Sequence, residues 1–530
     1  MDGKSIIARF EQAKNGRYNF DNHWQEVADL VLPTREFQTD YAPGEKRRNK
    51  IFSDVAPEAA ESLAAALSGL LTNTSTRWFS LMPTDPSLRG VRAVDQYLYD
   101  VTEVMLSYFD GNNCGFALAS HEMYLDIVCF GTGCMLVNDT DSGPSFQARD
   151  LSNFYLMEDD QGKIVEVYRK FKMTEREAYE TFGDQLSEKT LSRIREGSSA
   201  GDYGSRKIEF IHAIIKRYDR DMLKLDNTNM EYASFYIERN EAHICSEGGY
   251  KQMPYLFPRW SKSPEETYGR SPAMKVLPGI KVANVMARNI LEASELAIRP
   301  PIMMPANSIE GPLRTSPGSL IYYRQGSRDY PRPLVSGANP GVGENLLQRQ
   351  ESRIEKAFFL ENLKMPNNDR MTATEIIQRR QEGLMQAAPI LSRLYAEFLD
   401  PLISRTFISL NKAKLLPDPP SVLEGRALTV EYRSPMANSK RQSHTQSFIQ
   451  AMQAASVLFQ IDPMAAKTID VDAAIRDIFE SASVDPKYLK EAKEVAAEKQ
   501  QMQAMQQQAM QAELAQKQGE AQQAQGAPQQ

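Results

Sequence analysis

The chain has 530 residues, a formal net charge of −7 and a pI near 5.6, with 42% hydrophobic and 25% charged residues. This length predicts more than one structural unit, and the ordinary composition excludes wholesale disorder. A protein that grips DNA tightly usually carries a basic excess, which is missing here, although an acidic balance is compatible with transient contact with a moving polyanion.

No pattern typical of a secretory signal is found, and the uncharged run at residues 62–76 is too short and too polar to cross a bilayer. Four cysteines in a chain of this length do not make a disulfide framework. We therefore expect a reducing cytosol and no membrane insertion.

The N-terminal part of the chain predicts helices. Residues 4–32 carry apolar side chains at helical spacing, with an expected interruption at Asn15-Gly16 and an end at Pro33. The Ala-rich residues 56–71 predict a second helix. Its apolar face is formed by Leu63, Leu67, Leu70 and Leu71.

The middle of the chain, residues 134–246, changes to short β-branched and aromatic runs separated by Gly, Asp and Asn. Such runs predict strands, and residues 174–182 predict one inserted helix. The predicted strands lie in residues 134–137, 164–168, 208–218 and 232–237. This block is expected to be α+β.

Two predicted helices follow. Residues 271–299 begin at Ser271-Pro272, a capping residue before an N1 proline, and end at Pro300-Pro301. Residues 300–340 are dense in Pro and Gly, which predicts a small separate module. The second helix is expected over residues 341–361.

A capping box marks the next helix. After a polar loop at residues 362–371, Thr372-Ala-Thr-Glu375 predicts a helix start, and the helix is expected to continue to residue 412. Pro389 and Pro401 should kink it. Its single apolar stripe is formed by Leu384, Ala388, Leu391, Tyr395, Phe398 and Leu402.

The C-terminal part is less informative. We expect helices in residues 413–490 and a Gln- and Ala-rich tail, partly disordered, in residues 491–530.

No catalytic or metal-binding pattern stands out. There is no Gly-x4-Gly-Lys-Ser/Thr phosphate loop, and Gly197-Ser-Ser-Ala-Gly201 follows a charged helical segment instead of the strand that a nucleophile elbow needs. Cys129 and Cys134 lack a second pair of metal ligands. Glu158-Asp159-Asp160 fits a solvated turn better than a divalent-cation site. We expect no enzymatic activity and no cofactor.

Several short motifs share one order and spacing. They are His23-Trp24-Gln-Glu-Val-Ala-Asp29, Ile51-Phe52-Ser-Asp54, Ala59-Ala60-Glu-Ser-Leu-Ala-Ala-Ala-Leu67, Trp78-Phe79-Ser-Leu81, Gly131-Thr-Gly-Cys134, Pro258-Arg-Trp260, Tyr268-Gly-Arg-Ser-Pro272 and Met371-Thr-Ala-Thr-Glu375. In these motifs the chain resembles the head-to-tail connector, or portal, family of short-tailed phages across about residues 5–440.

The resemblance implies an α+β, mainly helical portal fold. Its parts would be N-terminal helices with an α/β wing (1–270), a two-helix stem (271–299 and 341–361), a small α/β clip (300–340), a tunnel loop (362–371), a kinked long helix (372–412), a helical crown (413–490) and the tail (491–530). The family also implies a ring of about twelve subunits at one capsid vertex of the virion, assembled in the host cytoplasm.

The implied function is a channel for packaging, retention and ejection of double-stranded DNA. The candidate DNA contacts, made to phosphate without sequence preference, are the tunnel-loop residues Lys364, Asn367, Asn368, Asp369 and Arg370. The first stem helix carries a mixed-sign polar face, which is either a solvated face or part of a subunit interface or channel wall. This stem face is formed by Lys281, Arg288, Glu292, Glu295 and Arg299.

The clip carries clustered Arg and Tyr side chains, which suit docking of terminase during packaging and of tail adaptor or tube proteins afterwards. A nucleic-acid patch is the alternative for the same residues. They are Arg314, Tyr322, Tyr323, Arg324, Arg328 and Arg332, with Tyr330 beside them. Capsid and scaffolding proteins are further implied partners.

Three other classes compete with a portal. A packaging enzyme such as a terminase would need the phosphate loop and clustered acidic ligands that are missing from the sequence. An internal ejection or channel protein should show a strongly apolar or amphipathic membrane segment. Another virion assembly protein, such as a scaffold, is suggested only by the Gln-rich tail.

Overall fold

The computed structural model describes residues 2–38, 51–73, 76–88, 91–111, 114–200, 206–221, 224, 226–303, 332–333, 340–360, 387–423, 428–432 and 450–454, together with 474–475, 478, 495, 498–502, 504–505 and 508. The chain divides into two units. The first comprises Met1–Gly69, Ala117–Asn138 and Ser145–Arg405, and the second comprises Leu70–Phe116, Asp139–Pro144 and Thr406–Gln530. Both helices and strands are present, so the fold is mixed α and β.

The first unit contains a five-stranded antiparallel sheet in the order β4-β5-β6-β7-β8. The strands are β4 (Phe154–Glu158), β5 (Ile164–Thr174), β6 (Lys207–Lys216), β7 (Tyr232–Glu238) and β8 (His243–Tyr250). The strands predicted at 164–168, 208–218 and 232–237 are confirmed. Each strand pairs with the next one in sequence, so short connections suffice.

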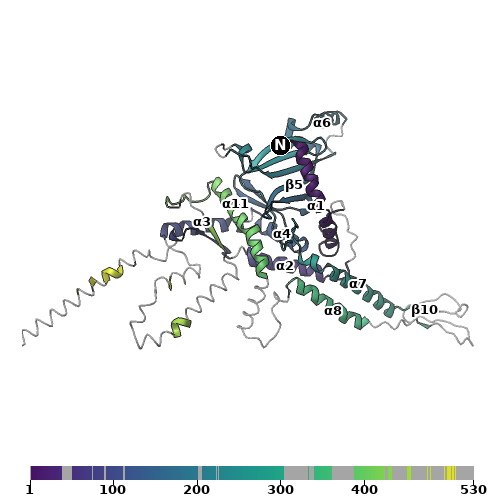
Figure 1. Ribbon diagram of the computed structural model, residues 1–530. Helices are drawn as coiled ribbons and strands as arrows, with labels where there is room; N and C mark the ends of the chain where they lie inside the picture. The colour runs from purple at the N-terminus through teal and green to yellow at the C-terminus, as the bar shows by residue number, and fades with distance from the viewer. Residues whose placement is uncertain are drawn as a thin grey trace, which may run out of the picture. The chain divides into compact units, whose positions relative to one another are not determined.

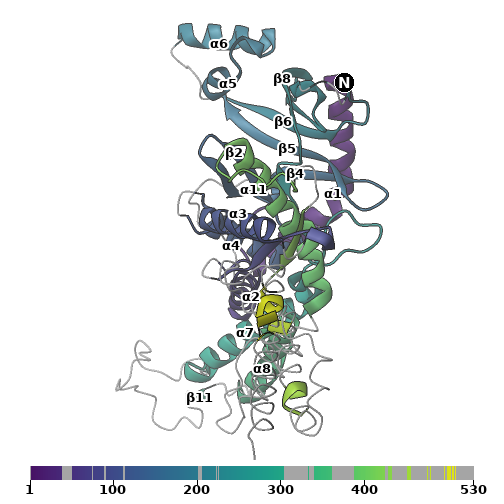
Figure 2. The same ribbon diagram turned by 90° about the vertical axis from the view of Figure 1, so that its left-hand side faces the viewer.

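Both faces of this sheet are covered, which explains why β6 is buried along most of its length. Ile211, Ala213 and Ile215 pack with Ile6 and Phe10 of α1 (Gly3–Leu30). The alternate residues, Ile208 and Phe210, pack against α5 (Glu175–Phe182) and α6 (Glu188–Ala200). Figure 1 shows α1 lying along the sheet, and Figure 2 shows α5 and α6 at the end of β5 and β6.

Helix α1 is continuous, so the interruption predicted at Asn15-Gly16 is wrong. A glycine inside a helix costs about 1 kcal/mol relative to alanine. The buried face continues across this point from Ala13 to Arg17, and its packing outweighs that cost. Local propensity alone predicted a break where tertiary contacts hold one helix.

The predicted helix at 174–182 is confirmed, and its start is a capping box that the sequence analysis overlooked. The Thr174 side chain accepts a hydrogen bond from the Glu177 amide, and the Glu177 side chain accepts one from the Thr174 amide. The capping box predicted at 372–375 lies outside the described residues.

The first unit also contains α2 (Val55–Leu71) up to Gly69 and α4 (Phe116–Phe130) from Ala117 onward. The predicted face of α2 is largely confirmed, because Leu63, Leu67 and Leu71 are buried, whereas Leu70 is half-buried. A small sheet has the order β3-β2-β9. Its strands are β2 (Met135–Thr140), β3 (Gly143–Ala148) and β9 (Tyr255–Leu256).

Two long helices form an antiparallel hairpin in the first unit (Figures 1 and 2). They are α7 (Pro272–Ile298) and α8 (Pro340–Ala357), as predicted. However, α8 ends at Ala357 instead of residue 361, because Phe359 adopts a left-handed backbone with φ of 59°. Beyond α7, β10 (Ile302–Met303) pairs with β11 (Arg332–Pro333).

The helix predicted over 372–412 is confirmed from residue 387 onward, and its earlier part lies outside the described residues. A π-helical turn, η5 (Tyr395–Leu399), precedes α11 (Asp400–Lys412). Leu391, Phe398 and Leu402 of the predicted apolar stripe are buried.

The second unit contains α3 (Arg92–Asp110) and a two-stranded sheet of β1 (Phe79–Pro83) and β12 (Leu428–Tyr432). Residues 428–432 therefore correct the helical prediction for 413–490. Their alternation of apolar and polar side chains suits a strand. An aromatic cluster fills the core of this unit: Trp78, Phe79, Phe109 and Phe116.

Short 3-10 turns connect several elements. They are η1 (Pro86–Leu88), η2 (Leu151–Asn153), η3 (Gly183–Gln185) and η4 (Asn227–Asn229).

Candidate functional site

The helical hairpin is the candidate functional element, and α7 begins inside a dense polar core. The side chain of Ser271 accepts a hydrogen bond from the Met274 amide at 2.9 Å and donates one to the Cys129 carbonyl at 2.7 Å. The predicted cap is thus confirmed, and Pro272 occupies N1. The cap also ties the start of α7 to the end of α4.

Two glycines allow the segments around this start to meet. Gly131 has φ of 80°, and a Cβ there would overlap the Gly269 carbonyl. A Cβ at Gly269 would in turn overlap the Gly131 carbonyl. The Gly269 amide donates to the Thr132 hydroxyl at 2.9 Å, and the Trp260 amide donates to the Gly131 carbonyl at 2.9 Å. Only glycine fits this close backbone approach.

Aromatic side chains fill the remaining space. The Trp24 indole donates to the Phe130 carbonyl at 2.9 Å and meets the Tyr268 ring edge to face at 5.1 Å. The Tyr268 hydroxyl accepts a hydrogen bond from the Leu156 amide at 2.9 Å, and burial raises its pKa to about 12. Tyr268 therefore stays neutral.

Four motifs that carried the family resemblance thus meet in one place. They contain Trp24, Gly131–Cys134, Pro258–Trp260 and Tyr268–Pro272. We call residues 129–134, 258–260 and 268–274 the α7 root. These motifs carried the family resemblance, but their spacing in the sequence did not predict that they gather around the first turn of α7.

Arg259 is the charged centre of the α7 root. It is only 4% exposed, and all five of its guanidinium N–H donors have acceptors. Nε and Nη2 donate to the Glu397 carboxylate at 3.0 and 2.8 Å, and Nη1 donates to Glu158 at 2.9 Å. The carbonyls of Thr267 and Gly162 accept the remaining two.

This network joins three elements. Glu397 lies in η5, Glu158 ends β4, and Lys262 binds Glu158 at 2.7 Å. Burial acts to lower the pKa of Arg259, but Glu397 and Glu158 together raise it above its ordinary value. The Asp159 side chain accepts hydrogen bonds from the amides of Gln161 and Lys163, which confirms the predicted solvated turn for Asp159 and Asp160. The prediction is wrong for Glu158, because this residue ends β4 and its carboxylate pairs with Arg259 and Lys262.

The predicted stem face lies on the exposed side of α7. Lys281 forms an ion pair with Glu26 of α1 at 2.9 Å, and Arg288 forms one with Glu292 at 2.8 Å. The Arg299 amide donates to the Glu295 carbonyl and caps the helix. These exposed pairs contribute about 0–1 kcal/mol each, so the face has little role in holding the subunit together.

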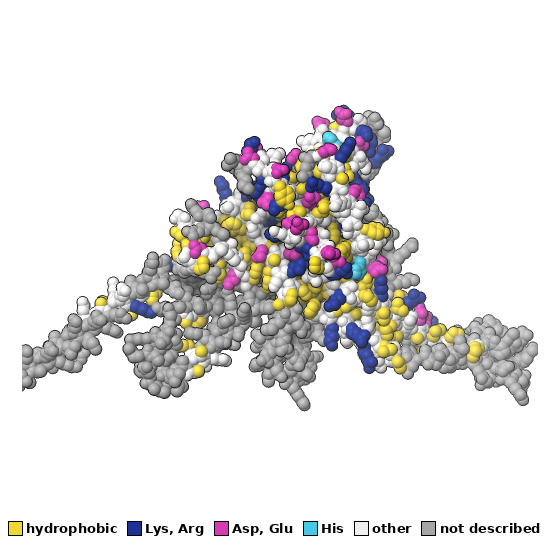
Figure 3. All heavy atoms as spheres, viewed as in Figure 1, with side chains coloured by type: hydrophobic (Ala, Val, Ile, Leu, Met, Phe, Trp, Pro, Cys, Tyr) yellow, Lys and Arg dark blue, Asp and Glu magenta, His cyan; other side chains and the backbone are white. Residues whose placement is uncertain are grey.

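The far part of the hairpin has half-buried and exposed side chains but no fully buried one among its described residues. Ala287 is the last buried residue of α7, and no described side chain in residues 288–303 or 340–349, here called the distal hairpin, is buried. Figure 3 shows hydrophobic side chains gathered over this hairpin. They are Leu291, Leu296, Ile298, Met303, Val342 and Leu346, each between 47% and 79% exposed. An apolar surface of this kind is typical of an interaction site.

Two groups of predicted site residues cannot be placed. All five tunnel-loop residues (Lys364, Asn367, Asn368, Asp369 and Arg370) lie outside the described residues. So do the clip residues Arg314, Tyr322, Tyr323, Arg324 and Arg328, whereas only the backbone of Arg332 is described, in β11.

Sequence reasoning missed two buried ion pairs near the α7 root. Arg17 is 1% exposed and binds Asp21 at 2.8 Å and the Leu151 carbonyl at 3.0 Å. Arg35 binds both oxygens of Asp126, at 2.9 and 3.1 Å. Burial raises the pKa of Asp126 to about 7 although Arg35 acts to lower it. An arginine on the otherwise apolar face of α1 was the available signal for Arg17.

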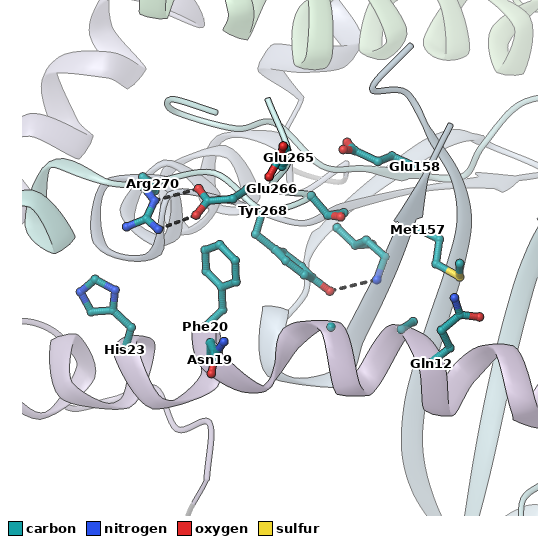
Figure 4. A pocket seen from close by; sticks show the side chains of 14 residues that line it. Gln12, Asn19, Phe20, His23, Met157, Glu158, Glu265, Glu266, Tyr268 and Arg270 are labelled. Carbon is teal, nitrogen blue, oxygen red and sulfur yellow. Dashed lines mark hydrogen bonds and ion pairs between the residues drawn. The ribbon is translucent and has the colours of Figure 1, made fainter. Parts of the chain in front are cut away.

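A pocket of about 530 Å³ lies between α1, β4 and the segment before α7 (Figure 4). Its charged lining is largely paired within the protein, because Arg270 binds Glu266 and Glu158 binds Lys262. The rings of Phe20 and Tyr268 form an aromatic wall of the pocket, and their centroids are 5.5 Å apart. These internal contacts leave no charge pattern that singles out a ligand.

The chemistry of the remaining groups is structural. All four cysteines are buried and free, and burial raises the pKa values of Cys129 and Cys134 well above the ordinary range. Residues 197–200 of the Gly-x-Ser-x-Gly match continue α6. Within the described part of the chain, no group of three or more His, Cys, Asp or Glu is placed to hold a metal. None of the described helices is long and apolar enough to span a membrane.

Comparison with known proteins gives consistent matches. The family model described as bacteriophage head to tail connecting protein matches residues 3–489. The chain is 29% identical over 503 residues to a probable portal protein of Bordetella phage BPP-1, covering 93% of this chain and 90% of that protein. It is 28% identical over 494 residues to a portal protein of Salmonella phage epsilon15, covering 91% and 87%. The similarity therefore extends far beyond the short motifs.

Proposed function

The chain belongs to the bacteriophage head to tail connecting protein family, which makes it a portal protein, and from this premise we propose that its copies close into a ring around a DNA channel. The ring would stand at one capsid vertex and join the head to the tail. In this role the protein acts by assembly and positioning, without catalysis. Assembly would take place in the host cytoplasm.

The distal hairpin is the observation that supports this proposal most directly. A closed ring needs two different faces of each subunit to meet. The distal hairpin exposes Leu291, Leu296 and Ile298 on α7 and Val342 and Leu346 on α8, and each of these side chains is at least 47% exposed. Contact with neighbouring copies would bury these side chains, and each Å² of apolar surface removed from water would stabilise the ring by about 25 cal/mol. The exposed charged pairs of α7 would then lie at the interface rim or face the channel.

The other parts of the subunit follow the same proposal. The five-stranded sheet with α1, α5 and α6 would form the wing, and α7 with α8 would form the stem. Residues 300–340 would form the clip, and residues 413–490 would contribute to the crown. These assignments rest on the position of each segment along the family pattern.

The tunnel loop would supply the main DNA contacts. Ring symmetry multiplies each channel charge by the number of subunits, so Lys364 and Arg370 would each become a collar of about a dozen cations. Contacts to phosphate carry no sequence preference, as a packaging channel requires. The net charge of −7 would keep the rest of the wall from holding DNA too tightly.

The clip would bind protein partners in turn. Its Arg and Tyr side chains are the types enriched at protein interfaces, and we expect them to dock terminase during packaging and a tail adaptor afterwards. Capsid and scaffolding proteins would contact the outer surface of the ring. Replacing Arg324 and Arg328 by Glu should weaken adaptor binding, measured with purified rings. Unchanged binding would contradict docking through the clip.

The decisive experiment is negative-stain microscopy of the purified full-length protein. We expect rings with a central opening. A chain that stays monomeric under all conditions, including those of capsid assembly, would overturn the proposal.

The tunnel loop has its own test. The double variant Lys364→Gln with Arg370→Gln should form normal rings but yield particles that retain less DNA, since the collar cations are gone. DNA content per particle, measured by quantitative PCR after nuclease treatment, gives the result. Loss of the ring itself would show that these residues have a structural role instead.

A further inference from the structure

Two adjacent residues of the α7 root contact the described chain before and after the segment 361–386, at Phe359 and at Glu397, which lies eleven residues past its end. Arg259 binds Glu397, which follows the segment, and Trp260 contacts Phe359, which precedes it. Residues 361–386 themselves lie outside the described residues.

The leading end is fixed by three consecutive residues. Phe358 is fully buried and Leu360 is 5% exposed. Between them, Phe359 ends α8 with φ of 59°, and its ring lies 6.2 Å from the Trp260 ring. Glycine usually occupies such a left-handed position after a helix. A phenylalanine that adopts it is held there by its surroundings, which here include Trp260.

The trailing end is fixed through the π-helical turn η5. Pro401 has no N–H with which to complete an α-helical bond to the Glu397 carbonyl, and the Asp400 amide bonds instead to the Tyr395 carbonyl, five residues back. One extra residue in the turn rotates the helix before it by about 100° relative to a regular helix. The π turn therefore determines which way the preceding helical residues 387–394 face while Glu397 is bound to Arg259.

Glu397 accepts three hydrogen bonds from Arg259. The Arg259 amide and Nε donate to Oε2, each at 3.0 Å, and Nη2 donates to Oε1 at 2.8 Å. Arg393, one turn earlier, lies 3.5 Å from the same carboxylate. Glu158 and Lys262 connect this cluster to β4. The trailing end is thus linked to the central sheet of the subunit.

We propose that Arg259 and Trp260 form a clamp that sets the distance and orientation between the two ends of residues 361–386. Both are positioning residues, because they touch the flanks of the segment and not the segment itself. The inference rests on the proposed function, in which Lys364 and Arg370 of this segment contact DNA. The clamp would then set where the chain enters and leaves residues 361–386, the segment that contains Lys364 and Arg370.

The test uses variants that loosen one end each and leave Arg259 in place. Glu397→Gln keeps the shape of the side chain but removes its charge, and Phe359→Leu removes the ring that meets Trp260. The matched control is Glu266→Gln, which weakens the ion pair of Arg270 within the α7 root without touching Glu397 or Phe359. Full-length rings are compared by hydrogen exchange, and particles are compared by DNA content.

Amide exchange should rise about tenfold in residues 387–394 for Glu397→Gln, the factor expected when a charge-assisted hydrogen bond is weakened. Phe359→Leu should raise exchange in residues 354–360. Both variants should form rings and retain less DNA, whereas Glu266→Gln should match the wild type in both measurements.

Unchanged exchange in both variants would overturn the clamp. Raised exchange with normal DNA content would overturn its positioning role, provided that the variant Lys364→Gln with Arg370→Gln does lose DNA. If that charge variant also retains DNA normally, the proposed role of the tunnel loop is wrong and the clamp has no channel function. The two failures are therefore distinguishable.

Discussion

The two halves of α7 have opposite surroundings although they belong to one unbroken helix. The first half starts in the α7 root, where Ser271, Gly131 and Arg259 make contacts that admit few substitutions. In the second half of α7, no described residue after Ala287 is buried, and exposed Leu and Ile side chains are present. One end of the helix is thus built for the stability of the subunit, and the other is available for contacts between subunits. The following changes test this division, from the largest expected effect on stability to the smallest.

Arg259→Met should give the largest loss, about 3–5 kcal/mol of unfolding free energy, because the half-buried Glu397 carboxylate would keep only the longer contact with Arg393 and Glu158 would keep only Lys262. Thermal and urea denaturation measure it. The control is Arg270→Met, whose pair with Glu266 is more exposed and should cost about 1 kcal/mol or less. Equal losses of stability in the two variants would show that the buried Arg259 network contributes no more than an exposed ion pair of the α7 root.

Gly131→Ala should cost about 2–4 kcal/mol, since alanine disfavours the positive φ and its Cβ would overlap the Gly269 carbonyl. Gly16→Ala is the matched control. It lies in the middle of α1 with open space around it and should stabilise the protein by about 1 kcal/mol. A neutral Gly131→Ala would show that the backbones at the α7 root do not need to approach so closely.

Asp126 should make stability depend on pH. Burial raises its pKa to about 7, so the folded protein binds this proton more tightly than the unfolded chain does. Its stabilising contribution is complete below the unfolded pKa near 4 and is lost as pH rises towards 7.

Relative to Asp126→Asn, the wild type should therefore lose about 1.4 kcal/mol per pH unit across this window. Urea denaturation from pH 4 to pH 8 provides the comparison. Parallel pH profiles for the two proteins would contradict a raised pKa.

The double variant Leu291→Gln with Ile298→Gln should change the stability of the separated subunit least, by about 0.5 kcal/mol or less, because both side chains are exposed. Its effect should appear in assembly, where rings become fewer or dissociate at higher protein concentration than wild-type rings. Sedimentation velocity measures this. Normal rings from this variant would assign the apolar surface of the distal hairpin to another partner or to none.

The sequence was sufficient where the signal is local. Ser271-Pro272 predicted the start of α7, because a capping hydroxyl and an N1 proline act within one turn. Short β-branched and aromatic runs predicted β5, β6 and β7, because such side chains fit the pleated surface of a sheet. The family resemblance also came from short motifs alone.

Tertiary structure decided what depends on residues far apart in the chain. Packing against the sheet carried α1 through Gly16, and pairing with β1 made residues 428–432 a strand. The contacts of Arg259 with Glu158 and Glu397 join residues separated by 101 and 138 positions. Local propensity contains no record of such pairings, because their free energy comes from burial and charge compensation that exist only after the chain has folded.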